Sequence, residues 1–263
     1  MTTLVSLRSR STANRILIAL TALLAVVLGV HGPIPQWADY HAFADTRSGL
    51  GIPNAANVLS NLPFALVGLW GLRAFAAAGP ATPARAAWIG LSVALICTAA
   101  GSAYYHWAPS NGPLVFDRIP IAWACVAIVA ALLADRGLPR WATPGALAIG
   151  ALAAAAVVLH WYWSEQQGAG DLRLYLFVQM LPMLLVPVAL LIGMRPIERG
   201  ATADSAWWAV LACYLAAKVA ESLDAQLLQA IGVLSGHALK HLLAALGAAL
   251  LLRGAIAARR HGV

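Results

Sequence analysis

Charged residues are scarce in this chain of 263 residues, since Asp, Glu, Lys and Arg together make up only 10% of it. A soluble domain carries about a quarter of charged residues. Apolar residues make up 61% of the sequence, and the mean hydropathy is +0.77. This composition excludes a soluble globular protein and leaves a helical membrane protein with several spans.

Acidic residues and cysteines are also few. The chain has 10 Asp and Glu against 17 Lys and Arg, so it is basic. The basic residues stand singly or in short pairs between apolar runs, without a stripe of basic and aromatic residues, and we therefore expect no nucleic-acid partner. The three cysteines, Cys97, Cys125 and Cys213, lie far apart inside apolar stretches. This placement excludes a disulfide framework and a CxxC metal site.

The apolar runs predict eight membrane spans, because a span takes about 20 mainly apolar residues. Such runs lie at 15–31, 54–77, 86–107, 117–134, 142–163, 172–193, 205–228 and 236–256. No clean signal-peptidase site follows the first run, which favours a retained anchor over a cleaved signal peptide. We therefore predict an all-α membrane protein. Its parts are an N-terminal tail with one extra transmembrane helix (1–35), a seven-helix transmembrane bundle (36–256) and a cytoplasmic tail (257–263).

The positions of the basic residues predict the orientation of these spans. Twelve arginines fall on one side of the predicted membrane: Arg8, Arg10, Arg15, Arg73, Arg85, Arg136, Arg140, Arg195, Arg199, Arg253, Arg259 and Arg260. The opposite connections and span starts hold Arg47, Arg118, Arg173 and Lys240. Because basic residues are enriched in cytoplasmic loops, we expect both termini in the cytoplasm.

Four polar clusters interrupt the apolar pattern, all on the predicted outer side: GSAYYHW, VFDRIP, GHALKH and the loop DYHAFADTRSGLGIPNAANVLSN. His237 and His241 are four residues apart and share a helix face, which is a two-ligand metal motif. A catalytic zinc ion typically takes three protein ligands. His106, at the same predicted depth, is the natural third ligand. The alternative is that these are ordinary histidines at the membrane interface.

These motifs in this order resemble the alkaline ceramidase family, within the superfamily of membrane hydrolases that also holds the adiponectin-type receptors. The motifs are GS-x-x-x-H, D-x-x-P beginning eleven residues after its histidine, G-H-A-x-x-H near the C-terminus, and an N-terminal N-x-x-S-N. The resemblance implies a seven-helix core with zinc bound by His106, His237 and His241. It also implies that Ser102 and Asp117 act at the attacking water and the amide, and that the substrate is a membrane lipid of the ceramide type. Cleavage of its N-acyl bond gives a sphingoid base and a fatty acid.

A calcium site is a further implication of the resemblance. Eukaryotic members build it from acidic residues ahead of and at the start of their first core helix, and Asp39 and Asp45 are the candidates here. This sequence departs from the pattern at Asn54, where those members have an acidic residue. Because calcium affinity follows the number of charged ligands, we expect weaker binding at such a site.

Amide hydrolysis gives chemical roles to Asp117 and Ser102. Asp117 can take a proton from the attacking water and later give it to the departing amine. Ser102 can donate a hydrogen bond to the water or to the developing oxyanion. Each residue also has a structural alternative. Asp117 can stabilise a helix N-terminus, paired with Arg118, and Ser102 can bond back to a helix carbonyl beside Gly101.

Two functions of other classes compete with hydrolysis. One is a metal or proton transporter, since ionisable residues inside helices also mark ion pathways. A transporter needs polar groups through the whole membrane depth, whereas the His and Asp residues here gather at one end of the spans. The other is a receptor-like module with a structural zinc ion. Asp117 and Ser102 beside an open metal position would distinguish hydrolysis from that module.

The charge asymmetry gives a prediction of topology. A reporter fused after Val263 should report the cytoplasm, and a reporter inserted at 164–171 should report the outside. Activity of both fusions on the same side of the membrane would contradict the eight-span topology. Reversal of both would place the histidine motifs on the cytoplasmic side.

Overall fold

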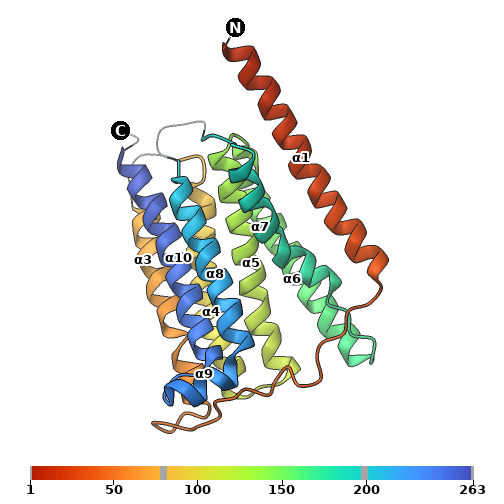
Figure 1. Ribbon diagram of the computed structural model, residues 1–263, viewed down its shortest axis with the longest axis vertical. Coiled ribbons are helices and arrows are strands. Elements are labelled where there is room, and N and C mark those ends of the chain that lie inside the picture. Colours follow the sequence, from red (N-terminus) through yellow and green to blue (C-terminus); the bar gives the residue numbers. More distant parts are fainter. Residues whose placement is uncertain (1, 78–81, 197–200, 262–263) are drawn as a thin grey trace.

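The computed structural model describes residues 2–77, 82–196 and 201–261, and the regular elements among them are all helices (Figure 1). In chain order they are α1 (Thr2–His31), α2 (Ala55–Leu59), α3 (Leu62–Ala76), α4 (Arg85–Trp107), α5 (Asn111–Asp135), the 3₁₀ turn η1 (Pro139–Ala142), α6 (Pro144–Gln166), α7 (Arg173–Leu191), α8 (Asp204–Ser222), α9 (Asp224–Ile231) and α10 (Gly236–His261). The predicted all-α class is confirmed.

The protein is a multi-pass membrane protein. Seven helical stretches in the described part of the chain are long and apolar enough to cross a membrane, or eight if the bent pair α8 and α9 is one span. The structure therefore agrees with the eight predicted runs. The helices differ from these runs at three places, which are described next.

The first difference is the start of α5, which begins at Asn111 rather than at the predicted residue 117. Pro113 falls in its first turn, where the missing amide proton is not needed for a helical hydrogen bond. The polar residues before Asp117 therefore belong to the helix. Asp117 lies almost two turns inside α5, which is inconsistent with the alternative that it stabilises the helix N-terminus.

The other two differences are breaks inside predicted spans. The run 54–77 is interrupted at Ser60 and Asn61, between α2 and α3. The run 205–228 ends as a straight helix at Ser222, and α9 then turns by 83° from α8. Both breaks lie at the end of the bundle that holds the histidines. Polar side chains at these breaks contact the histidine residues, as described below.

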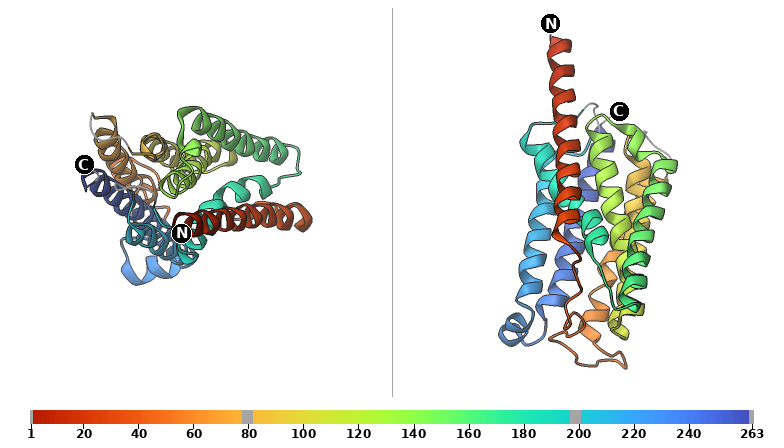
Figure 2. Two further views of the ribbon diagram at one scale, coloured as in Figure 1. Left: turned by 90° about the horizontal axis from the view of Figure 1, so that it is seen from above. Right: turned by 90° about the vertical axis from the view of Figure 1, so that its right-hand side faces the viewer.

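The helix α1 lies beside the bundle and not within it (Figure 2). It packs against α7, and only 11% of its candidate span is buried. Both termini lie at one end of the bundle, whereas α9 and the connection 32–54 lie at the other (Figure 1). This arrangement agrees with the prediction of one extra N-terminal helix and an even number of spans.

Aromatic residues fill the bundle core at both ends. Near the termini, Phe75, Trp88 and Trp207 pack together from α3, α4 and α8. Near the opposite end, Tyr105 of α4 and Trp161 belong to a second apolar cluster formed mainly by α5 and α6. The residues discussed below lie beside this second cluster.

A glycine lets α4 and α5 approach backbone to backbone. A Cβ atom on Gly101 would overlap the carbonyl oxygen of Phe116, which belongs to the facing helix. Small residues commonly allow such contacts between membrane helices. The contact places Ser102 and Asp117, the next residue on each helix, side by side.

Replacement of this glycine should therefore destabilise the bundle. We expect Gly101→Ala to lower the free energy of unfolding by about 1–3 kcal/mol, because the helices must separate to admit the methyl group. Thermal unfolding in detergent would measure the loss. Gly145→Ala is the matched control, since a Cβ there meets nothing within 4 Å, and it should be neutral or stabilising. Equal stability of the two variants would contradict the close contact.

Candidate metal centre

Three buried histidines meet at one end of the bundle. His106 lies in the last turn of α4, and His237 and His241 lie in the first two turns of α10. One ring nitrogen from each lies within 4.8 Å of the others. The ring centroids are 4.8–4.9 Å apart in all three pairs. The structure thus brings together the three predicted ligands, from helices more than 130 residues apart in sequence.

These residues fit a metal ion by the geometry of their nitrogens. The Nε2 atoms of His106 and His237 are 3.3 Å apart. Zinc–nitrogen distances of about 2.0–2.1 Å in a tetrahedral site give an edge of about 3.3–3.4 Å between two ligand nitrogens. Within the described residues, this is the group of His, Cys, Asp or Glu side chains that could hold a metal. The histidines therefore form a candidate site for one metal ion.

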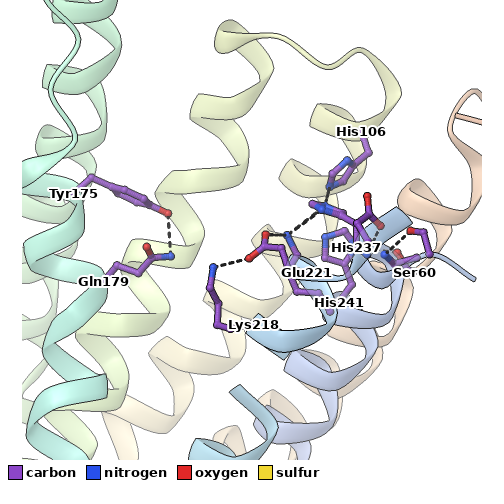
Figure 3. Close-up of polar contacts among 12 residues, drawn as sticks. Ser60, His106, Tyr175, Gln179, Lys218, Glu221, His237 and His241 are labelled. Atoms are coloured by element: carbon purple, nitrogen blue, oxygen red, sulfur yellow. Dashed lines mark hydrogen bonds and ion pairs between the residues drawn. The ribbon is translucent and has the colours of Figure 1, made fainter. Parts of the chain in front are cut away.

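Ser60 orients one of these ligands. Its hydroxyl donates to the carbonyl oxygen of Asn57 at 3.0 Å and lies 2.8 Å from Nδ1 of His241 (Figure 3). A hydroxyl has only one proton, so Ser60 accepts the proton of Nδ1. The Nε2 atom of His241 is then unprotonated and able to bind a metal, as is usual where a second group holds the other ring nitrogen.

The backbone around the histidines is held by two polar side chains. Asp224, at the start of α9, accepts from the amide of Ala44 at 2.9 Å and from the amide of His237 at 2.7 Å. Asn54 donates to the carbonyl of His106 at 2.8 Å from a left-handed conformation with φ of 47°, which asparagine tolerates better than most residues. The connection 32–54 is thereby joined to α4 and α10.

Asp117 and Ser102 lie together beside this site. Ser102 and Asp117 follow the two residues that touch at the Gly101–Phe116 contact, and both are buried. The Oδ1 atom of Asp117 has no hydrogen-bond partner among the described residues. Ser102 also shares a face of α4 with His106, one turn away. The carboxylate is thus available to a group in the adjoining cavity.

That cavity has a volume of about 460 Å³ and lies between α4, α5, α7, α8 and α10. Ser102, Asp117 and His241 line its polar end, and its walls extend along α4 to Leu91. Eleven residues at 1.5 Å each place Leu91 about 16 Å from Ser102 along the helix. The cavity is therefore long, with its polar groups at one end.

A lysine and glutamate chain also lies at the polar end, as Figure 3 shows. Lys218 donates to Glu221 within α8. Lys240 on α10 donates to the other carboxylate oxygen at 2.8 Å and lies 3.2 Å from Nε2 of His237. Sequence reasoning used Lys240 only for the orientation of the spans and did not include it among the site residues, although its place between the two histidines of α10 was a signal.

The candidate calcium residues lie in the connection 32–54. Asp39 is exposed. Both carboxylate oxygens of Asp45 accept hydrogen bonds from Arg47, and these bonds hold the pKa of Asp45 below its ordinary value. Asn54 bonds to His106 instead of facing either acid. The calcium site stays a prediction.

Neither a scan against models of known protein families nor a search of curated proteins matches the chain. The chemistry of the site is therefore interpreted from its own residues.

Metal binding is the prediction that follows from this geometry. Purified protein should contain about one divalent ion per chain, and His237→Ala and His241→Ala should each lose most of it. Ser60→Ala should weaken metal affinity by about 10–100-fold, the usual effect of losing a group that orients a ligand. Elemental analysis and competition with a chelator would measure both effects.

His160→Ala is the control, because this histidine is exposed on α6 and lies outside the group of three. Full metal retention in both α10 variants would contradict the site. Unchanged affinity in Ser60→Ala would leave the three ligands in place but remove the orienting role of the serine.

Proposed function

We propose that the protein is a zinc-dependent amidohydrolase that cleaves the N-acyl amide bond of ceramide-like lipids to a sphingoid base and a fatty acid. One observation carries the proposal. The cavity that His241 lines also holds the Asp117–Ser102 pair at its polar end, and it continues from there into an apolar channel. The motif resemblance to alkaline ceramidases points to the same reaction.

Asp117 is the proton carrier in this proposal. Its carboxylate takes a proton from the attacking water as the new carbon–oxygen bond forms, and it returns a proton to nitrogen as the carbon–nitrogen bond breaks. A bound zinc ion supplies a Lewis acid that lowers the pKa of water and polarises a carbonyl. Ser102 lies beside Asp117 across the contact of α4 and α5, where its hydroxyl can orient the carboxylate. The sequence analysis also gives Ser102 a second role. After rotation about its side chain, its hydroxyl can donate a hydrogen bond to the developing oxyanion.

The shape of the cavity supports a lipid substrate. Leucine and isoleucine side chains line the deep part, among them Leu91, Leu95, Ile128 and Leu251. An acyl chain would bury its apolar surface there, while its amide stays at the polar end. The cavity extends about half the thickness of a bilayer core of about 30 Å. This length suits one acyl chain held within the membrane.

The alternatives of transport and of a structural zinc site are less well supported. An ion pathway needs polar groups along its length, yet the deep cavity wall is apolar. A structural site needs no acid beside it, yet the buried carboxylate of Asp117 keeps an oxygen without a partner among the described residues. The predicted orientation, with cytoplasmic termini, puts the metal centre toward the outer side of the membrane.

Loss of the proton carrier should separate catalysis from metal binding. We expect Asp117→Asn to keep its metal and fold but to lose about 10²–10⁴-fold in ceramide turnover, the usual contribution of a positioned acid or base. Ser102→Ala should lose about tenfold to a thousandfold. Turnover is measured by lipid analysis after incubation of purified protein with ceramide, with and without a chelator.

Glu165→Gln is the control, because Glu165 lies near the end of α6 and does not line the cavity. It should hydrolyse ceramide at the wild-type rate. An Asp117→Asn protein with bound metal and near wild-type turnover would remove Asp117 from the mechanism. Absence of ceramide hydrolysis in the metal-loaded wild type would overturn the proposed substrate.

A further inference from the structure

Arg118 is a buried cation that the proposed reaction does not use. It follows Asp117 on α5, is only 2% exposed, and lines the cavity. The sequence suggested that it pairs with Asp117, but within the described residues no carboxylate lies at salt-bridge distance from its guanidinium. Its guanidinium therefore lines the same cavity as Asp117 but forms no salt bridge with it.

Aromatic rings hold this guanidinium in place. Its carbon atom Cζ lies 4.0 Å from the ring centroid of Trp161 and 5.0 Å from those of Tyr40 and Tyr175. One nitrogen, Nη2, donates to Gln36 at 2.8 Å. Contacts with ring faces stabilise a cation without using its N–H donors. The ring contacts and the bond to Gln36 thus fix the position of the Arg118 side chain, while most of its N–H donors remain unused.

The other two nitrogens are the open ones. Nε and Nη1 of Arg118 are buried and have no hydrogen-bond partner among the described residues. A buried charge with unmet donors is unfavourable unless another group completes it. Arg136, a buried arginine directly after α5, pairs with the carboxylate of Asp204, although its Nε also has no partner among the described residues. Among the residues that the structure describes, Arg118 lacks such a carboxylate, which indicates that a ligand supplies it.

The charge of the surrounding wall favours an anionic ligand. The cavity lining holds three cationic side chains, Arg118, Lys218 and Lys240, against the two carboxylates of Asp117 and Glu221. Glu221 is already shared by the two lysines. Guanidinium groups bind phosphate and carboxylate oxygens through strong charge-assisted hydrogen bonds.

We infer that Arg118 binds an acidic head group, so that the preferred substrate is an N-acyl lipid with a phosphate or carboxylate on its amine side and not a neutral ceramide. This inference rests on the proposed amide hydrolysis and specifies its substrate class. Arg118 and Asp117 both line the polar end, so an anion bound at Arg118 holds the head group beside Asp117. The acyl chain then occupies the deep apolar part.

Binding of simple amphiphiles tests this site without any hydrolysis. Dodecyl phosphate and dodecanol are titrated separately into the purified full-length protein in nonionic detergent, with calorimetric detection. We expect wild type to bind the phosphate at least about tenfold more tightly, as charge-assisted hydrogen bonds permit. Arg118→Gln should reduce this preference to within about twofold, and Arg118→Lys should give an intermediate value.

Arg173→Gln is the matched control, since Arg173 starts α7 near the same end of the bundle, pairs with Asp171 and does not line the cavity. Its phosphate preference should equal that of wild type. Absence of a preference in wild type would overturn the inference. So would an undiminished preference in Arg118→Gln, which would leave Arg118 as a support for the connection that carries Tyr40. If the glutamine variant does not fold, Arg118→Met takes its place, and an undiminished preference in that uncharged variant has the same meaning.

A turnover comparison separates this inference from the proposed function. Ceramide and the same ceramide phosphorylated on its primary hydroxyl are compared by kcat/KM in wild type and Arg118→Gln. A wild-type preference for the phosphorylated lipid that disappears in the variant supports the inference. Hydrolysis of both lipids at equal kcat/KM would overturn it and keep amide hydrolysis. Selective binding of dodecyl phosphate without hydrolysis of either lipid would keep the anion site and overturn the function.

Discussion

The approach of α4 and α5 at Gly101 is the constraint on which the site depends. A bundle of helices in lipid gains little from the hydrophobic effect between them, so close packing must supply the association. At this contact the two backbones meet without an intervening side chain. Ser102 and Asp117 therefore face each other at the place where α4 also presents His106. Gly101 thus allows the carboxylate of Asp117 on α5 to lie close to the part of α4 that carries His106.

The histidine group depends on a second set of contacts, made by irregular backbone. The break between α2 and α3 places Ser60 against His241, and the bend between α8 and α9 places Asp224 at the first turn of α10. Breaks in helices are tolerated at membrane depth where they are buried in protein or line a cavity. Both breaks are found where the ligands need support.

Much of the fold could be predicted from the sequence, because apolar runs of sufficient length have few other uses. The three histidines could be predicted too, since two share a helix face and the third has the same depth. The start of α5 was misplaced because Ser110 and Asn111 resemble a loop, although Pro113 suits a first helical turn. The alternative that Asp117 pairs with Arg118 is not found among the described residues, because sequence neighbours on a helix point in different directions. The contacts of Ser60 and Asp224 join residues 181 and 13 positions apart, and no local pattern contains them.

The two hydrogen bonds of Asp224 have a thermodynamic consequence. One carboxylate joins the amide of Ala44, in the connection that covers the histidines, to the amide of His237. Phe43, the neighbour of Ala44, packs its ring 4.4 Å from that of His237. Binding of an ion by the three histidines would therefore be linked to docking of the connection, and such a linkage is reciprocal. An ion that binds His237 would then stabilise the docked connection. A ligand that displaces the connection would lower the affinity for the ion by the same factor.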